Sequence, residues 1–303
     1  MSIFARLGAA LPPLDPFARV TDTARLKALD ELLGERAGEV AECQALSAEP
    51  TASIDRIDAI ARATLGALRS RGPFETLDTW VRTDAAEILD APDIDPEVRA
   101  EALRRLEALN EESGAHALFA GALEAALDDR PAPHVYEVAA GTGGFARRAG
   151  PGLRDARPEL RWTVSDLDAG GLETGAEDPS WLRKEARDAV ALGDISGVDL
   201  FLCVQAAHHL SPGMVVRFLA RASRAPLGAL ILDVHRGGVV AGVAGVVGAA
   251  LGQNRIVALD GMRSARRAYT PAELALLARL AGARVVRAGP LGPAYAVLHA
   301  VRP

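Results

Sequence analysis

The sequence has few cysteines, and their positions exclude the protein classes that depend on them. Cys43 and Cys203 are the two cysteines in 303 residues, and neither lies in a CxxC or Cys/His spacing. This pattern argues against a disulfide framework and against a structural zinc site. Both thiols suit a reducing cytoplasm, and Cys203, inside an apolar run, is predicted to be a small core residue.

Long apolar runs and dense basic stretches are also scarce. The stretch GGVVAGVAGVVGAALG at 237–252 has 16 residues, and a helix needs about 20 apolar residues to span a bilayer. We expect it to form a buried helix or a lid over an apolar pocket. The amino-terminal MSIFARLGAALPPLDP has one arginine and an apolar run broken by prolines, which is not typical of a signal peptide. Lys and Arg total 34 against 40 acidic residues, a balance that disfavours nucleic acid as a partner.

What the sequence does contain fits a globular chain of one or two domains, with 49% hydrophobic and 24% charged residues. Before Pro131 the apolar spacing is helical, clearest in the ranges 21–33, 53–70 and 93–114. Ser53 and Asp95 are predicted N-caps, the latter followed by Pro96. We therefore expect residues 1–130 to form a helical N-terminal domain, either a cap over a substrate or a dimerisation unit.

After Pro131, strand-like and helical stretches alternate. The predicted strands are 134–140, 161–166, a weak one before Asp188, 198–204, 228–234, 284–289 and 294–302. This alternation predicts a doubly wound, mostly parallel α/β sheet of seven strands. The last two strands are joined by the short AGPLGP, which cannot hold a crossover helix, so this pair is predicted to be antiparallel.

The first of these strands runs into a glycine turn in VYEVAAGTGGFARRAG, residues 135–150. Gly141, Gly143 and Gly144 let the chain turn sharply, and the helix that follows offers free N–H groups to a ligand. Gly141-x-Gly143-x-x-Ala146 with Asp166 downstream satisfies the loose dinucleotide fingerprint. A dinucleotide does not need Glu137 at the strand end, however. S-adenosylmethionine, with its sulfonium and amino groups, does use such an acid.

Residues 135–303 resemble a class I S-adenosylmethionine-dependent methyltransferase of the ubiquinone-biosynthesis-like, small-molecule group. In the family's first motif Glu137 stands at the acid, Ala139 at the first glycine, and Gly141 and Gly143 at the second and third. The resemblance implies that Asp166, rather than Asp168, binds the ribose hydroxyls. It also implies that Asp188 contacts the adenine amino group. The cofactor residues that it implies are Glu137, Ala139, Gly141, Gly143, Asp166, Leu167, Asp188, Ala189 and Val204.

The fourth strand leaves through VQAAHHLSP, which resembles the His-His-Leu turn of small-molecule methyltransferases. His209, or else His208, is the candidate general base for a hydroxyl acceptor, because histidine titrates near neutrality. The alternative is that one histidine only packs or caps the turn. Thr270, Pro271 and Glu273 predict a capping box.

Three residues before this capping box are the candidate substrate residues. Arg263, Arg267 and Tyr269 would hold an acidic or carbonyl acceptor; the alternative is that the arginines are solvated surface groups. No metal site is predicted.

The sequence therefore predicts a cytoplasmic S-adenosylmethionine-dependent methyltransferase with residues 131–303 as its cofactor-binding domain. The favoured reaction is O-methylation of a small, partly apolar metabolite resembling a polyketide, phenol or quinone. The alternatives are N- or C-methylation, a non-catalytic S-adenosylmethionine-binding protein, and an NAD(P)-dependent oxidoreductase. An oxidoreductase would be expected to carry a Tyr-x-x-x-Lys motif. This sequence has none, since its only lysines are Lys27 and Lys184. A homodimer through the N-terminal helices is one further expectation.

Overall fold

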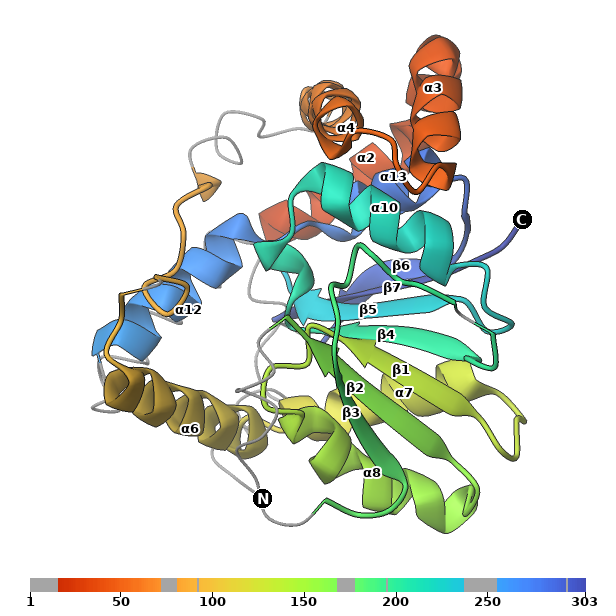
Figure 1. Cartoon of the computed structure of the whole chain (residues 1–303). Coiled ribbons are helices and arrows are strands. Elements are labelled where there is room, and N and C mark those ends of the chain that lie inside the picture. Colours follow the sequence, from red (N-terminus) through yellow and green to blue (C-terminus); the bar gives the residue numbers. More distant parts are fainter. Residues whose placement is uncertain are drawn as a thin grey trace.

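The computed structural model of the protein describes residues 16–71, 81–91, 93–167, 178–194, 196–236, 255–292 and 294–303. The stretch 237–252 and Asp168, both discussed above, lie outside the described residues. The described front of the chain is helical (Figure 1), with α2 (Pro16–Glu35), α3 (Ala37–Ala48), α4 (Ile54–Arg69), α6 (Pro96–Glu112) and α7 (Ala115–Leu127).

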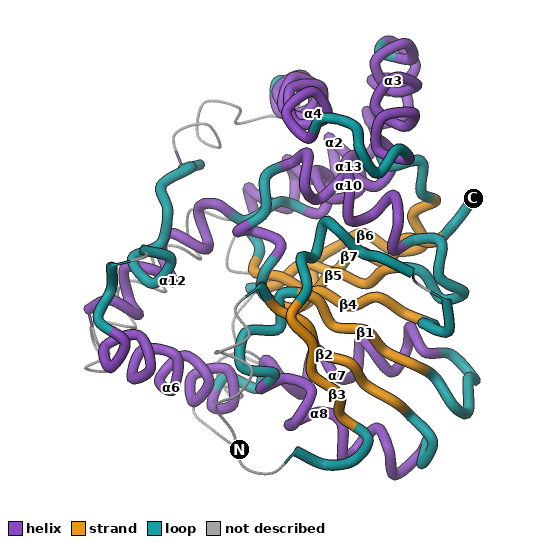
Figure 2. Tube along the Cα trace, in the orientation of Figure 1, coloured by secondary structure: helices purple, strands orange, loops and turns teal. Residues whose placement is uncertain are grey.

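The rest of the chain forms a seven-stranded sheet (Figure 2) in the order β3-β2-β1-β4-β5-β7-β6. The strands are β1 (His134–Val138), β2 (Arg161–Asp166), β3 (Leu182–Ala186), β4 (Leu200–Val204), β5 (Ala229–Val234), β6 (Arg284–Leu291) and β7 (Tyr295–Val301). Strands β1 to β5 pair in parallel, and β7 pairs antiparallel with both β5 and β6. The predicted fold class is confirmed, including the antiparallel carboxyl-terminal strand.

The central strands β4 and β5 are buried on both faces, so they read as continuous apolar runs, whereas the edge strands β3 and β6 are more exposed. In β4, Phe201 and Cys203 pack into the hydrophobic cluster with α10 (Pro212–Ala222) and α13 (Pro271–Leu280). Leu200 and Leu202 point to the opposite face, where they pack with α7 and α8 (Gly144–Ala156). The remaining helices are the short 3₁₀ turn η1 (Ala207–His209) and α12 (Arg255–Arg267).

The front helices α2 to α4 lie outside α10 and α13 (Figure 1) and are joined to them by specific contacts. The Gly213 N–H at the start of α10 donates to Asp58 of α4 at 2.8 Å. A Cβ on Gly213 would lie 2.6 Å from the Asp58 backbone nitrogen, so α4 and α10 pack closely only because this position is glycine. Asp22 of α2 accepts from the Ala272 N–H of α13 at 2.8 Å.

The helix caps follow the sequence with one exception. The Asp95 side chain accepts from the N–H groups of Glu97 and Val98, and Thr270 with Glu273 forms the predicted capping box. Ser53 stands at the N-cap position of α4, but its side chain makes no capping hydrogen bond. Among the described residues, no helix combines the length and the apolar character needed to cross a bilayer.

Candidate functional site

The candidate site lies where the sheet changes its direction of winding. After β1 the chain adds β2 and β3 on one side and then returns to place β4 on the other side of β1. In open α/β sheets the crevice at the carboxyl ends of such strands is the usual ligand site. A cavity of about 700 Å³ opens here, lined by the turns after β1, β2 and β4 and by the segment from Glu87 to Asn110.

Glu137 is a buried carboxylate that lines this cavity. Its side chain is buried and accepts a hydrogen bond from the Trp162 indole N–H at 3.0 Å. Burial raises the pKa of Glu137 to about 8, although the Trp162 bond opposes this shift. A buried acid of this kind is poised to ionise when a cation arrives beside it.

The glycine turn after β1 is fastened to the end of β2. The Gly141 N–H donates to Asp166 Oδ2 at 2.8 Å, and the Gly143 N–H donates to the Ala140 carbonyl at 2.8 Å. Gly141 and Gly143 have φ of 54° and 74°, and Ala139 has φ of 49°, a conformation that costs a side-chain-bearing residue about 1–2 kcal/mol. Ala139, Gly141 and Asp166 all line the cavity.

The other predicted cofactor residues divide into two groups. Leu167 and Val204 line the cavity, and Leu167 is 73% exposed. Asp188 lies just beyond β3, where its Oδ1 accepts from the Val190 N–H at 2.9 Å. Ala189 packs in the hydrophobic cluster beneath α10. Neither Asp188 nor Ala189 is among the described residues that line the cavity, and their roles stay predictions.

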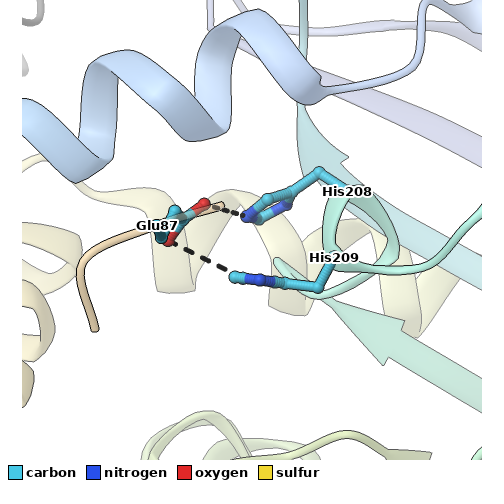
Figure 3. A group of neighbouring side chains, drawn as sticks. All are labelled: Glu87, His208 and His209. Carbon is cyan, nitrogen blue, oxygen red and sulfur yellow. Dashed lines mark ion pairs between the residues drawn. The ribbon is translucent and has the colours of Figure 1, made fainter. Parts of the chain in front are cut away.

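His208 is a buried imidazole held between two carboxylates. Its Nδ1 lies 2.8 Å from Asp233 Oδ1. Its Nε2 lies 3.4 Å from Glu87 Oε1 (Figure 3). Burial lowers the pKa of His208, but the charges and hydrogen bonds of Asp233 and Glu87 outweigh it and raise the pKa to about 10. His208 therefore keeps its proton at neutral pH and cannot accept another.

His209 is the histidine that faces the cavity. Its side chain is 33% exposed, and its Nδ1 lies 3.1 Å from Asp90 Oδ2 while its Nε2 lies 3.9 Å from Glu87 Oε2. The two imidazole rings lie close together, with centroids 4.2 Å apart and an interplanar angle of 39°. Because an ionised carboxylate only accepts hydrogen bonds, Asp90 favours the tautomer of the neutral imidazole that has its proton on Nδ1 and its free lone pair on Nε2.

Glu87 and Asp90 come from the segment before α6 and were not predicted as site residues. Burial opposes ionisation of Glu87, but His208 and His209 hold the pKa of its carboxyl below the ordinary value. The Ser264 hydroxyl in α12 also donates to Glu87, at 2.7 Å. The hydrogen bond with His209 likewise lowers the pKa of Asp90. The helical pattern at 93–114 was the sequence signal nearest to them, and it gave neither residue a role.

Helix α6 contributes a further wall that the sequence did not identify. Asn110 and Gln205 exchange two amide hydrogen bonds, at 2.8 and 3.2 Å, between α6 and the turn after β4. A Cβ on Gly144 would lie 2.6 Å from Glu107 Oε1, so α6 lies directly against the glycine turn. The lining residues from this part of the chain are Glu87, Leu89, Asp90, Arg99, Leu103, Leu106, Glu107, Asn110 and His116.

The three predicted substrate residues lie behind the histidine turn. Arg263 donates to the Ala86 carbonyl at 3.0 Å, and Arg267 donates to the His209 carbonyl at 3.4 Å. Tyr269 is buried and donates to the Leu210 carbonyl at 2.8 Å. None of the three is among the described residues that line the cavity, and their role in binding an acceptor stays a prediction.

Comparison with known proteins gives similarity in structure only. No protein-family model and no curated protein sequence matches the chain. Human N-acetylserotonin methyltransferase, solved with S-adenosylmethionine, matches with a TM-score of 0.51 and 15% identity, over 84% of this chain and 71% of that one. The plantazolicin methyltransferase BpumL, solved with S-adenosylhomocysteine, matches with a TM-score of 0.51 and 11% identity, over 69% and 91%.

The chain has the class I methyltransferase fold. The pyocyanin biosynthetic protein PhzM matches with a TM-score of 0.49 and 20% identity, and this chain spans 59% of PhzM's length while 67% of this chain is covered. At such identities the likeness establishes the methyltransferase fold alone. Activity therefore has to be argued from the residues of the cavity.

Proposed function

We propose that the protein is an S-adenosylmethionine-dependent methyltransferase that O-methylates a small, partly apolar metabolite. The observation that carries this proposal is the arrangement of Glu137, the turn at 139–144 and Asp166 around one cavity, with the Gly141 N–H bound to Asp166. The two structural neighbours at a TM-score of 0.51 are methyltransferases solved with this cofactor or its product, which supports the choice of ligand.

The residues present fit S-adenosylmethionine on chemical grounds. Glu137 would face the cationic methionine part, because it is a buried acid beside the glycine turn and its pKa of about 8 lets it ionise beside a positive charge. Asp166 would accept the ribose hydroxyls, since one carboxylate can accept several hydrogen bonds. A Cβ on Gly141 would meet nothing within 4 Å, so the backbone there is open to a ligand.

The transfer itself needs alignment and removal of one proton. When bound, the cofactor supplies an electrophilic methyl group on sulfur. His209 would accept the proton of an acceptor hydroxyl at Nε2, with Asp90 holding its Nδ1–H. His208 stays protonated between Asp233 and Glu87, and it would keep the turn and its neighbour in place.

The acceptor would lie between His209 and the front helices. Leu89, Leu103, Leu106 and Leu210 give this part of the wall an apolar character, which suits an aromatic or polyketide-like acceptor. Residues 1–130 would therefore act as a cap through α6; pairing of two chains through the outer helices α2 to α4 is the other role open to them. A reducing cytoplasm remains our expected compartment, because Cys43 and Cys203 are both buried free thiols.

An NAD(P)-dependent oxidoreductase is the alternative that the glycine turn allows. Calorimetry with S-adenosylmethionine, S-adenosylhomocysteine and NADH separates the two, and we expect only the first two ligands to bind. Asp166→Asn should weaken S-adenosylhomocysteine binding by about 1–3 kcal/mol, whereas the exposed control Asp30→Asn should leave it unchanged. Binding of NADH, or equal affinity in the two variants, would remove the assignment. Methyl transfer to phenolic acceptors then tests the activity.

A further inference from the structure

Glu87, His208 and His209 form a cluster of metal-ligating groups at the edge of the cavity (Figure 3). One ligand atom from each of the three lies within 4.8 Å of the other two. Glu87 presents one carboxylate oxygen to each histidine, with Oε1 3.4 Å from His208 Nε2 and Oε2 3.9 Å from His209 Nε2. The three side chains come from the segment before α6 and from η1, so the fold brings them together from positions far apart in the sequence.

The outer atoms of both imidazoles are bound by carboxylates. Asp233 Oδ1 lies 2.8 Å from His208 Nδ1, and Asp90 Oδ2 lies 3.1 Å from His209 Nδ1. Asp233 is itself fixed, because it accepts the backbone N–H groups of His208 and Val234 at 2.8 and 2.7 Å. A histidine whose Nδ1–H is held by a carboxylate, with Nε2 turned inward, is the arrangement that orients histidine ligands in metalloproteins.

We propose that His208 Nε2, His209 Nε2 and the Glu87 carboxylate form a binding site for one divalent transition metal ion, with Zn²⁺ as the best-suited occupant. Two imidazole nitrogens and one carboxylate oxygen are a donor set that Zn²⁺ and Co²⁺ accept. Metal–ligand bonds of about 2.0–2.2 Å place neighbouring donor atoms roughly 3–3.5 Å apart. Glu87 Oε1 lies 3.4 Å from His208 Nε2 and Glu87 Oε2 lies 3.9 Å from His209 Nε2. One ligand atom from each residue lies within 4.8 Å of the other two, so the side chains would have to move inward to bind one ion.

The charges around the cluster favour a cation. Glu87, Asp90 and Asp233 contribute three carboxylates. Arg267 of α12 pairs with one of them, since its Nη1 lies 3.5 Å from Asp90 Oδ2. A divalent ion would take the place of the proton between His208 and Glu87 as the positive charge facing these acids. The side chains of His208 and Glu87 are 4% and 8% exposed, whereas His209 and Glu87 also line the cavity, so an ion would reach the cluster from the cavity.

The proposed metal site has a consequence that rests on the proposed methyltransferase function. Coordination uses the same Nε2 lone pair by which His209 would accept the acceptor's proton. A bound metal ion therefore excludes base catalysis by His209, so the proposed base-catalysed transfer belongs to the metal-free protein.

Metal binding is tested on the full-length protein after removal of adventitious metal with a chelator. Equilibrium dialysis against ZnCl₂ followed by metal analysis should give one equivalent of bound zinc, and CoCl₂ should give the visible absorption of a low-coordinate cobalt site. Glu87→Gln and His209→Asn should each lower the zinc affinity at least about 100-fold, since each removes one of three ligands. Asp90→Asn should lower it by about 10–100-fold, the usual effect of losing an outer partner of a histidine ligand.

The matched control is His116→Asn, because His116 also lines the cavity but belongs to α7, outside the cluster. It should bind one equivalent of zinc like the unaltered protein. Circular dichroism of each variant establishes that it is folded. Less than half an equivalent of zinc at saturating concentration, or unchanged affinity in folded Glu87→Gln and His209→Asn, would overturn the site. S-adenosylhomocysteine binding is measured separately on the metal-free protein, so a failed metal site leaves the proposed function standing, and the reverse also holds.

Discussion

The carboxyl group of Glu137 combines a buried position with a role that requires its charge. Burial raises its pKa to about 8, whereas the same group in the unfolded chain titrates near 4.5. Between these two values the folded protein holds a proton that the unfolded chain has released. Stability therefore falls as the pH rises from about 4.5 to about 8, because the unfolded state binds fewer protons over that range.

We expect Glu137→Gln to remove this part of the pH dependence. Between about pH 6 and pH 8.5 the unaltered protein should lose about 2 kcal/mol of unfolding free energy through Glu137, at about 1.4 kcal/mol per pH unit. His208 adds a loss of the same sign, because its pKa is raised from 6.5 to about 10. The stabilisation from protonated His208 is complete below pH 6.5 and is lost as the pH rises from 6.5 to about 10. The difference between the two proteins in urea titrations at both pH values isolates Glu137. Parallel pH profiles would contradict the assignment.

The same variant should lose affinity for the proposed cofactor. The neutral glutamine side chain of Glu137→Gln cannot supply the charge that faces the cationic methionine part, so S-adenosylhomocysteine binding should weaken even while the protein becomes more stable at high pH. Calorimetric titration at about pH 8 measures this change. If Glu137→Gln is more stable at high pH and binds S-adenosylhomocysteine with unchanged affinity, the cationic group of the ligand does not lie beside Glu137.

His209→Asn tests the base at the cavity edge. The asparagine amide can still donate to Asp90, but it has no nitrogen that accepts a proton. Turnover of the metal-free protein should therefore fall by about 10²–10⁴-fold, and S-adenosylhomocysteine affinity should stay close to the original value. Labelled methyl transfer to a phenolic acceptor measures turnover. A variant with full activity would end the candidacy of His209.

At this scale the sequence predicts the residues that belong to one local motif. Glu137, Ala139 and Gly141 follow each other along the chain, and Asp166 ends the next strand, so their common cavity follows from the parallel sheet. Glu87 and Asp90 lie in a segment with no regular secondary structure of its own. Nothing in their spacing indicates that they meet His208 and His209, because packing of that segment against α12 and η1 is what brings them there.

At the scale of elements, the contact between α4 and α10 depends on one glycine. Gly213→Ala should destabilise the protein by about 1–3 kcal/mol, the usual cost of overpacking, because its Cβ would lie 2.6–2.7 Å from Asp58 backbone atoms. The matched control is Gly66→Ala on the exposed side of α4, where a Cβ meets nothing within 4 Å. That change should stabilise by about 0.5–1 kcal/mol, since alanine is the better helix former. Chemical unfolding of both variants measures the two effects.

The sequence predicts the individual strands and helices better than it predicts which of them contact one another. Strands such as β4 and β5 follow from apolar runs, and the helices that begin at Pro96 and Pro271 follow from capping residues, which act within a few positions. Strand β3, LRKEA, has no apolar run, and its sequence predicted it only weakly. The hydrogen bonds between Asn110 and Gln205 join α6 to the turn after β4. Amide side chains at these two positions carry no pattern that marks them as a pair, and only the folded chain places α6 over the cavity.

At the scale of the whole molecule, the described helices before the sheet share its hydrophobic core. Leu32 and Leu65 of the front helices belong to the same buried cluster as Phe218 and Leu276. On the other face Phe119 of α7 packs against the methyltransferase helix α8 and against β7. Its ring lies 6.2 Å from the Phe145 ring and 4.8 Å from the Tyr295 ring. The predicted domain boundary between residues 130 and 131 would assign α7 and the sheet to different domains, although they share one hydrophobic cluster.

We therefore expect the full chain to unfold in one cooperative transition. Removing residues 1–130 would expose the apolar surface that α4 covers on α10 and that Phe119 covers on the opposite face, and each buried aromatic side chain of this size stabilises by about 3–5 kcal/mol. Since a domain's total stability is about 5–15 kcal/mol, the fragment 131–303 should not fold alone. Scanning calorimetry of the full chain should give equal calorimetric and van't Hoff enthalpies. Two separate transitions, or a folded fragment that binds S-adenosylhomocysteine, would show instead that the helical front is an independent domain.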